Sequence, residues 1–154
     1  MRRADHVRRF ESRRCGAVAV EGAIVLSIFL GVLMATLDIS LAAARTNALT
    51  ECARRAGRRA IVCGKRSPAS QQWGPARWQG TAADSHPVAT AIRPLLVTMR
   101  PSDVRIQLNW PDGGIEAGQR VRVELSYSHR PTVPYVLGSG TWNLTAATTM
   151  RVVH

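Results

Sequence analysis

The chain has 154 residues, 45% hydrophobic and 20% charged, and its 21 Lys+Arg against 10 Asp+Glu give a formal net charge of +11. This length suits one small domain with an appended segment, and the ordinary hydrophobic fraction argues against a disordered chain. The three cysteines, Cys15, Cys52 and Cys63, form no CxxC pair and no Cys/His cluster, which excludes a zinc ribbon and a disulfide-framework fold.

The N-terminal 16 residues are basic, and the 21 residues that follow them are apolar. Residues 1–16 contain six arginines against two acidic residues, whereas Ala17–Leu37 carries a single charge, Glu21. As an α-helix this run would be about 30 Å long, at ~1.5 Å per residue, which matches the hydrocarbon core of a bilayer. The pattern predicts a basic leader over residues 1–16 and a transmembrane helix over residues 17–44.

Two other interpretations of the apolar run compete with a membrane helix. One is a buried helix of a soluble protein, although runs this apolar are rare in soluble chains of this size. The other is a signal peptide that is removed at the small residues Ala42–Ala44. However, the uncharged stretch Gly22–Leu37 already has 16 residues, longer than the ~7–15 of a signal peptide. The helical pattern also continues through Arg45, so we favour a retained membrane helix.

The distribution of arginine predicts how the helix is oriented. Six arginines precede the apolar run, and only Arg45, Arg54 and Arg55 lie within about 20 residues after it. Because cytoplasmic flanks are enriched in arginine and lysine, we expect the N-terminus in the cytoplasm. Residues 45–154 would then form an extracytoplasmic domain, in the periplasm or outside the cell.

Glu21 is the one charge in the apolar run, and a carboxylate costs up to ~2.5–3.5 kcal/mol at the centre of a bilayer. It follows a basic segment, Gly16 and four small or apolar residues, and it precedes an uninterrupted apolar helix. This arrangement resembles the processing site of type IV pilin-like proteins. The segment RRCGAVAVEGAIVLSIFLGVLMATLDIS (residues 13–40) in particular resembles the TadE family, pseudopilins of tight-adherence (Flp-type) pilus and secretion systems.

The resemblance implies a processing site and a set of partners. It implies that a prepilin peptidase cuts between Gly16 and Ala17 and that Glu21 becomes the fifth residue of the mature chain. The new α-amino group of Ala17, charged below a pKa of ~7.7–8.0, would then pair with the carboxylate of a neighbouring subunit. The family usually has an aromatic residue after this glutamate, where this chain has Gly22. Implied partners are the membrane, the peptidase and other pilus subunits, with the protein in the bacterial inner membrane.

Beyond the apolar run, the helical pattern becomes amphipathic. An apolar stripe recurs at spacings of three and four residues, formed by Leu49, Cys52, Ala53, Ala56, Ala60 and Cys63. Four arginines (Arg54, Arg55, Arg58 and Arg59) lie on the opposite side, where Glu51 can pair with Arg55, and Gly64 supplies a stop. One helix of about 70 Å from Ala17 to Cys63 is therefore expected. The tract 46–61 also resembles the Ala/Arg/Gly-rich stretch of TadE-like proteins.

We interpret the arginine side as a solvated helix face. No aromatic residues interleave with the arginines, and the expected location is outside the cytoplasm, so no nucleic-acid partner is predicted. Cys52 and Cys63 would lie about 16 Å apart on a continuous helix, beyond the ~4.4–6.8 Å between the Cα atoms of a disulfide. Either both are unpaired packing residues, or the helix unwinds before Cys63 and a bridge forms.

The remaining sequence predicts a loop, a short helix and three strands. Residues 67–87 suit a long loop with Trp73 and Trp78 at the edge of the core, and Val88–Met99 suits a helix that Pro94 interrupts. Alternation with period two then predicts strands over 104–109, 121–127 and 144–152, with a turn at Pro111–Gly114 and breaks at Pro131 and Pro134. The fold class is α+β: a long N-terminal helix packed on a small antiparallel sheet, in the manner of a pilin. Residues 121–152 also resemble the C-terminal half of TadE-like domains.

Nothing in the sequence indicates catalysis. His6, His86, His129 and His154 are scattered, and no phosphate loop, HExxH or GxSxG motif occurs. Asp38, at the outer end of the apolar run, suits a membrane interface better than a catalytic role. We therefore expect no enzyme, no metal and no cofactor, but a structural or assembly component of a tight-adherence pilus or secretion system. The alternative is a secreted or single-pass binding protein unrelated to pili.

Overall fold

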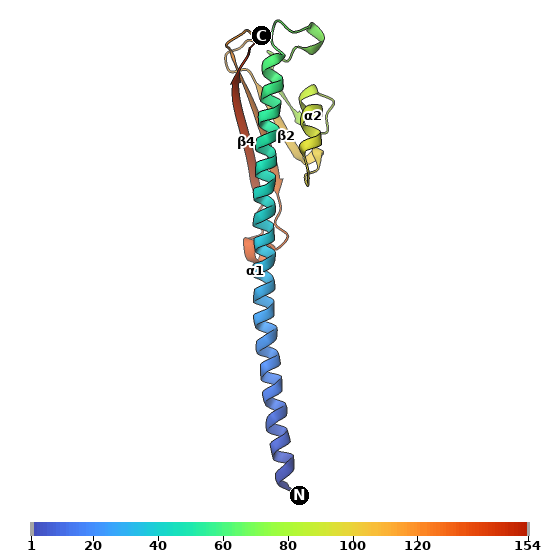
Figure 1. The fold of residues 1–154 in the computed structure, drawn as a ribbon, viewed down its shortest axis with the longest axis vertical. Helices are drawn as coiled ribbons and strands as arrows, with labels where there is room; N and C mark the ends of the chain where they lie inside the picture. Colours follow the sequence, from blue (N-terminus) through green and yellow to red (C-terminus); the bar gives the residue numbers. More distant parts are fainter. Residues whose placement is uncertain (1, 154) are drawn as a thin grey trace.

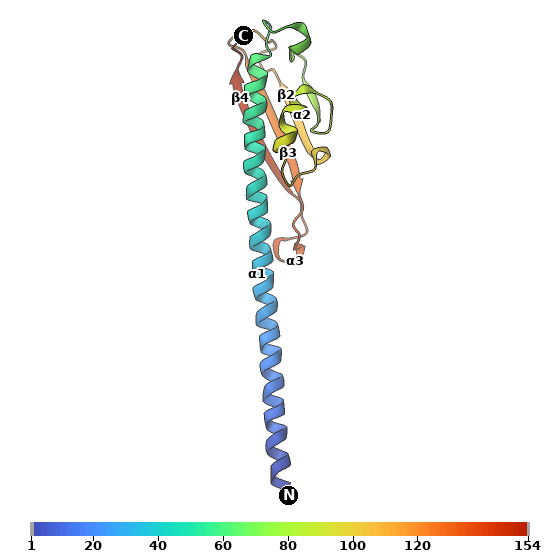
Figure 2. The same ribbon diagram turned by 45° about the vertical axis from the view of Figure 1, so that its right-hand side comes forward.

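A long helix carries a small α+β domain on its C-terminal half (Figure 1). The computed structural model describes the backbone of residues 2–153 and the side chains of residues 16–68, 70–134 and 137–153. Helix α1 (Arg2–Val62) has 61 residues, which corresponds to about 90 Å at ~1.5 Å per residue. Its N-terminal half projects well beyond the domain in both views (Figures 1 and 2). The α+β prediction, with a long N-terminal helix as the spine, is confirmed.

The C-terminal end of α1 agrees closely with the prediction, whereas its N-terminal end lies well before the predicted start. The helix ends at Val62, one residue before the predicted end at Cys63. It begins at Arg2, so the backbone of the predicted leader continues the helix that was expected to start at Ala17. The only helix-weakening residue between these points is Gly16, which costs about 1 kcal/mol relative to alanine and does not break a helix on its own.

The sheet has four antiparallel strands in the order β1-β2-β3-β4, so that each strand pairs with the next along the chain. These are β1 (Trp78–Thr81), β2 (Val104–Asn109), β3 (Arg120–His129) and β4 (Trp142–Arg151). The longest ladder joins β3 to β4, from Arg120 opposite Arg151 to His129 opposite Trp142. The three predicted strands are all present and antiparallel, as β2, β3 and β4.

The helices cover one face of the sheet, and the core lies between them. Apolar residues of β2 and β3 point to this face and are at most 1% exposed: Val104, Ile106, Leu108, Val121, Val123 and Leu125. Their neighbours Arg105, Gln107 and Arg122 point to the other face and are exposed. Every member of the predicted apolar stripe on α1, from Leu49 to Cys63, is buried against this sheet and against α2 (Pro87–Ile92).

Small residues let α1 approach the sheet closely. A Cβ atom added at Gly57 would lie only 2.8 Å from Cγ2 of Thr148 and 3.1 Å from Sδ of Met150, both on β4. Ala53, Ala56 and Ala60 continue the same narrow surface and are all buried. Because packed interiors tolerate little added volume, the Ala/Gly content of this part of the helix follows from its contact with β3 and β4.

One part of the sequence prediction is wrong, and another is confirmed with closer bounds. Residues 67–87 were expected to be a loop, yet they contain β1, which pairs with β2 from Trp78 opposite Leu108 to Thr81 opposite Arg105. This four-residue strand includes Gly80 and shows no apolar alternation, so it depends on the edge that β2 offers. The short helix predicted from Val88 is present as α2, and Pro94 interrupts it as predicted. The α-helix ends at Ile92 and the chain continues as the 3₁₀ turn Arg93–Leu95, because Pro94 has no N–H group for an α-helical hydrogen bond. Leu96 and Met99 nevertheless stay in the core.

Three further short helical turns complete the chain. These are the 3₁₀ turns Ala69–Gln71 and Pro101–Asp103 and the one-turn helix α3 (Pro134–Leu137), which lies at the end of the domain nearest the free half of α1 (Figure 2). Pro131 and Pro134 end β3, as predicted, and Pro134 then begins α3.

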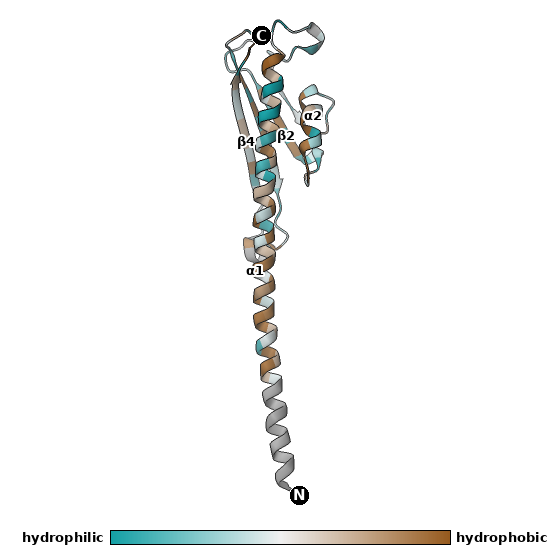
Figure 3. Cartoon of the chain, viewed as in Figure 1, coloured by the Kyte–Doolittle hydropathy of each residue, from teal (hydrophilic) through white to brown (hydrophobic). Residues whose placement is uncertain are grey.

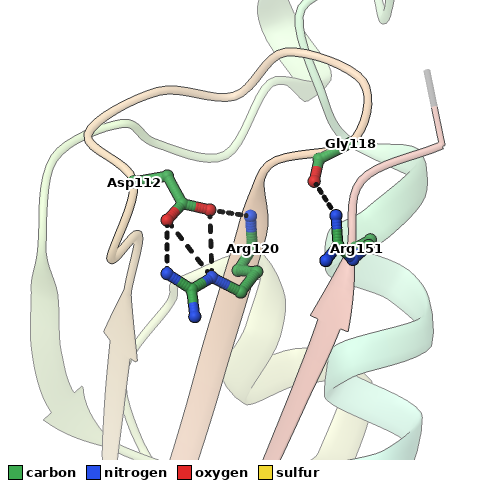
Figure 4. Close-up of polar contacts among 4 residues, drawn as sticks. All are labelled: Asp112, Gly118, Arg120 and Arg151. Carbon is green, nitrogen blue, oxygen red and sulfur yellow. Dashed lines mark hydrogen bonds and ion pairs between the residues drawn. The ribbon is translucent and has the colours of Figure 1, made fainter.

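An ion pair fixes the connection between β2 and β3 at the opposite end of the domain (Figure 4). The Asp112 carboxylate accepts hydrogen bonds from the backbone N–H of Arg120 at 2.8 Å and from its guanidinium Nη2 at 2.7 Å. These bonds lower the pKa of Asp112 to about 2. Nearby, Arg151 donates to the carbonyl of Gly118, whose φ of +89° favours glycine. The backbone N–H of Val153 donates to the carbonyl of Ile61 at 3.1 Å, which ties the last strand to the end of α1.

Candidate functional site on the long helix

The predicted processing residues lie on the part of α1 that contacts nothing else among the described residues. Gly16, Ala17 and Glu21 are all exposed, and no atom outside the helix lies within 4 Å of a Cβ built at Gly16 or Gly22. Ala35 is the first residue of α1 that the domain buries, about 20 Å along the helix from Glu21. The predicted site is therefore a linear motif on an isolated helix, open to an enzyme or to a second subunit from every side.

This isolated segment is predominantly hydrophobic, as the mostly brown ribbon in Figure 3 shows, and Glu21 is its one charged residue. From Val18 to Ile39, large hydrophobic side chains are exposed on every face of the helix, and Gly16–Val62 is the described helix that is long and apolar enough to cross a membrane. The hydroxyls of Ser27, Thr36 and Ser40 each donate to the carbonyl four residues earlier, at 2.8–2.9 Å, so they need no water. Because the residues of this segment before Ala35 pack on nothing else in the described chain, its interpretation as a core helix of this domain is wrong.

Asp38 joins the apolar segment to the domain. Its side chain is only 4% exposed, and its Oδ2 atom accepts hydrogen bonds from the backbone N–H groups of Thr132 at 2.7 Å and Val133 at 3.0 Å. Ala35 and Ala42, which are also buried, lie about one turn before and one turn after it, on the side of the helix that meets the domain. The sequence predicted a membrane-interface residue here, but it did not indicate that Asp38 would be the hydrogen-bond acceptor for the segment before α3.

Arg45, two turns further along α1, holds the other elements at this end of the domain. Its Nη1 atom donates to Nδ1 of His129 at the end of β3, and its Nη2 atom donates to the carbonyl of Thr98 at 3.0 Å. Its guanidinium carbon also lies 5.3 Å from the centre of the Tyr127 ring, within the range of a cation–π contact. A single side chain of the helix thus fixes the end of the sheet and the loop after α2, where Thr98 has a φ of +70°.

His129 is held in its neutral form. Its side chain is 1% exposed, and its ring lies 5.7 Å from that of Trp142. Burial is the main cause that lowers the pKa of His129, the charge of Arg45 adds to it, and the carboxylate of Asp38 opposes both. Since Nδ1 accepts the hydrogen bond from Arg45, the neutral ring carries its proton on Nε2. Protonation at Nδ1 would remove this acceptor and place two cations side by side.

The other residues that the sequence singled out have structural roles. Cys52 and Cys63 are free and buried, so they are packing residues and form no bridge, and burial raises the pKa of the Cys52 thiol to about 11. Trp73 is buried and Trp78 packs at the edge of the core, as predicted, with His86 stacked on Trp78 at 4.1 Å. Nδ1 of His86 also accepts from the backbone N–H of Val88 and caps α2.

No group of three or more His, Cys, Asp or Glu side chains in the described part of the chain is arranged to hold a metal ion. The side chains of Cys15 and His6, and the terminal His154, lie outside the described residues. The arginine side of α1 is exposed, as predicted, with Arg54, Arg55, Arg58 and Arg59 all on the surface. The expected ion pair between Glu51 and Arg55 is not formed among the described side chains.

Residues 16–58 match the model of the TadE-like protein family, which confirms the resemblance over this part of the chain. No curated protein and no solved structure matches the chain significantly. The match contains the Gly16–Glu21 motif, the apolar segment, Asp38, Arg45 and most of the arginine face. It ends before the sheet, so the resemblance of residues 121–152 lies outside it.

The Asp38→Ala variant should loosen the contact between α1 and the segment before α3. It would remove the charged acceptor of the partly buried hydrogen bonds from the N–H groups of Thr132 and Val133, and a hydrogen bond to a charged group contributes about 1.5–3 kcal/mol. Hydrogen–deuterium exchange of the detergent-solubilised protein should show faster exchange at 131–138 and little change in β2. Asp38→Asn keeps an acceptor oxygen and is the matched control. Equal protection in wild type and Asp38→Ala would contradict this role.

The folded state should lose stability as the pH falls below about 6.5, the ordinary pKa of histidine. The pKa of His129 is lowered in the folded protein, so the unfolded chain binds the proton first, and this contribution is present above pH 6.5 and is lost as the pH falls through the folded pKa. The denaturant midpoint, followed by tryptophan fluorescence from pH 8 to pH 4.5, should fall less steeply in His129→Gln than in wild type. Burial also lowers the pKa of His86, so this residue contributes to the pH dependence of stability as well. The His86→Gln variant measures the contribution of His86 separately from that of His129. An unchanged slope in His129→Gln would refute the assignment.

Proposed function

We propose that this chain, TadE-like over residues 16–58, is a membrane-anchored structural or assembly component of a tight-adherence pilus or a related secretion system. The observation that carries the proposal is the register of Gly16, Ala17 and Glu21 at the start of an apolar helix that the domain leaves uncovered. A pilin-like subunit needs such a helix, because its lateral surface must pack first in the membrane and then against other subunits. The protein acts as the substrate of a peptidase and not as an enzyme.

The proposed arrangement places residues 1–16 in the cytoplasm, residues 17–44 in the inner membrane and residues 45–154 in the periplasm or outside the cell. The arginine bias supports this orientation. The contacts of Asp38 and Ala42 support retention of the helix. Removal of a signal peptide at Ala42–Ala44 would delete the acceptor for the Thr132 and Val133 N–H groups.

Glu21 has a chemical role in this proposal. Cleavage after Gly16 creates an α-amino group at Ala17, at the start of the apolar segment, where hydration is poor. A carboxylate from Glu21 of a neighbouring subunit would neutralise this amine, so that two burial costs offset each other and the stagger between subunits is fixed. Glu21 is exposed on the bare helix, which leaves it available to such a neighbour.

The mature protein should begin at Ala17 when the prepilin peptidase is present. Intact-mass spectrometry of the membrane-extracted protein should show the loss of residues 1–16, and a strain without the peptidase should retain them. Gly16→Leu should block the cut and leave the fold intact, because nothing in the described structure packs on Gly16. An uncut chain in the presence of the peptidase, or an N-terminus near Arg45, would refute the proposed processing.

Glu21→Gln should reduce assembly without reducing membrane insertion. If the carboxylate pairs with the Ala17 amine of a neighbour, the variant leaves that amine unpaired, at a cost of about 3–5 kcal/mol. At 1.4 kcal/mol per factor of ten, crosslinking to other pilus subunits should fall by more than about a hundredfold. The exposed Ser27→Ala, on the same helix, is the control at equal protein level. Equal recovery of partners from Glu21→Gln and wild type would show that Glu21 only marks the edge of the membrane.

A further inference from the structure

A groove of about 750 Å³ runs between the C-terminal part of α1 and α2. Helix α1 lines it with Arg55, Arg58 and Arg59, and the segment around α2 lines it with the hydroxyl-bearing Ser85 and Thr90. Trp73, which is only 5% exposed, lies among the residues at its base. We call this feature the arginine groove. Its volume is in the range of clefts that hold ligands, about 300–1,000 Å³.

The three arginines of this groove have no acidic partner among the described side chains, and they lie together on one helix face. Elsewhere Lys65 pairs with Glu116, Arg120 with Asp112 and Arg122 with Glu124. No aspartate or glutamate lines the arginine groove. Three guanidinium groups at spacings of three and four residues on one helix repel each other. The groove therefore carries a concentrated positive charge that an anionic group would neutralise.

Lipid of the anchoring membrane is too far away to supply that anion. The apolar surface of α1 ends at Ile39, and Arg55 lies 16 residues later, about 24 Å further along the helix. The headgroup layer extends only about 5–8 Å beyond the hydrocarbon core. In both ribbon views, α2 lies toward the end of the molecule that is remote from the free half of α1 (Figures 1 and 2).

The chemistry of the groove favours a peptide over a nucleic acid. Single-stranded nucleic acids bind by stacking bases on exposed aromatic rings, and the buried Trp73 offers no such face. Arginine instead suits carboxylates, which its planar group can bind through two parallel hydrogen bonds. The apolar lining residues Val62 and Trp73 suit a chain in which apolar side chains alternate with acidic ones.

A second copy of this chain is a poor source of the acidic segment. Of the six acidic residues in 45–154, three pair with basic residues of the same domain, namely Asp112, Glu116 and Glu124. The other three, Glu51, Asp84 and Asp103, are isolated from one another in the sequence and form no acidic segment. We infer that the arginine groove binds an acidic peptide segment of a different protein, through Arg55, Arg58 and Arg59. This binding site is separate from the membrane-spanning segment and does not require cleavage after Gly16.

The test uses the full chain in nanodiscs of zwitterionic lipid. The probe is a fluorescein-labelled peptide, Glu-Leu-Glu-Glu-Leu-Glu, and fluorescence anisotropy measures its binding. The wild type should bind it at 0.05 M NaCl and release most of it at 0.5 M, because salt screens exposed charges. The triple variant Arg55→Gln/Arg58→Gln/Arg59→Gln should bind at least tenfold more weakly. The corresponding Gln-Leu-Gln-Gln-Leu-Gln peptide should not bind.

A matched variant distinguishes the effect of the groove arginines from the effect of net charge alone. Arg54→Gln/Arg66→Gln/Arg100→Gln removes the same three charges at exposed positions outside the groove and should change the affinity by less than about twofold. An equal loss in both triple variants, or no binding of the acidic peptide by wild type, would overturn the inference. So would tighter, groove-dependent binding of single-stranded DNA or heparin at the same salt concentration. Unfolding midpoints of both triple variants that equal that of the wild type would show that folding is intact. Cleavage by the peptidase is measured in its own assay, so a failure of processing is distinguishable from a failure of peptide binding.

Discussion

Helix α1 is unbroken, but its surroundings change over the two turns from Asp38 to Arg45. Before these turns most of the helix is uncovered, and after them it packs on the domain. Between Ala17 and Leu37 the helix carries large apolar side chains on every side, with Glu21 as its one charge, and its hydroxyls bond to its own carbonyls. After Arg45 one narrow stripe is buried and the opposite side is charged. Charged side chains are costly at such a boundary unless their partners are fixed. The domain supplies those partners, two N–H groups for Asp38 and a ring nitrogen and a carbonyl for Arg45.

This boundary also determines how the domain sits on the helix. At the near end Asp38 and Arg45 hold the segment before α3, the end of β3 and the loop after α2. At the far end, Val153 donates to Ile61, and the backbone N–H of Lys65 donates to the carbonyl of Ile115. Between these ends the approach of Gly57 to β4 leaves no room for a shift. A domain held at both ends and packed tightly between them follows the helix as one body, as a subunit that assembles through its helix requires.

The sequence predicted those elements whose residues repeat with a clear period. The strands around Val104–Leu108 and Val121–Leu125 alternate because one face is buried and the other is solvated, and the stripe from Leu49 to Cys63 has the helical spacing for the same reason. β1 has no such signal, because a four-residue edge strand with a glycine is specified by its neighbour. The sequence could not predict the role of Asp38 either, because its hydrogen-bond donors lie more than 90 positions away in the chain.

The two candidate sites differ in what they need from the fold, and this explains why only one could be predicted. The Gly16–Glu21 motif is linear and stands on a helix without neighbours, so its sequence contains all of it. The exposure of Arg55, Arg58 and Arg59 also follows from the helical period. Their convergence with Ser85 and Thr90 does not, because it depends on where α2 packs against α1. Glu21 and Arg55 are 34 residues apart on the helix, or about 50 Å. At that distance screened charges do not influence each other, so the proposed contacts between subunits and the proposed binding of an acidic segment would be independent of each other on one helix.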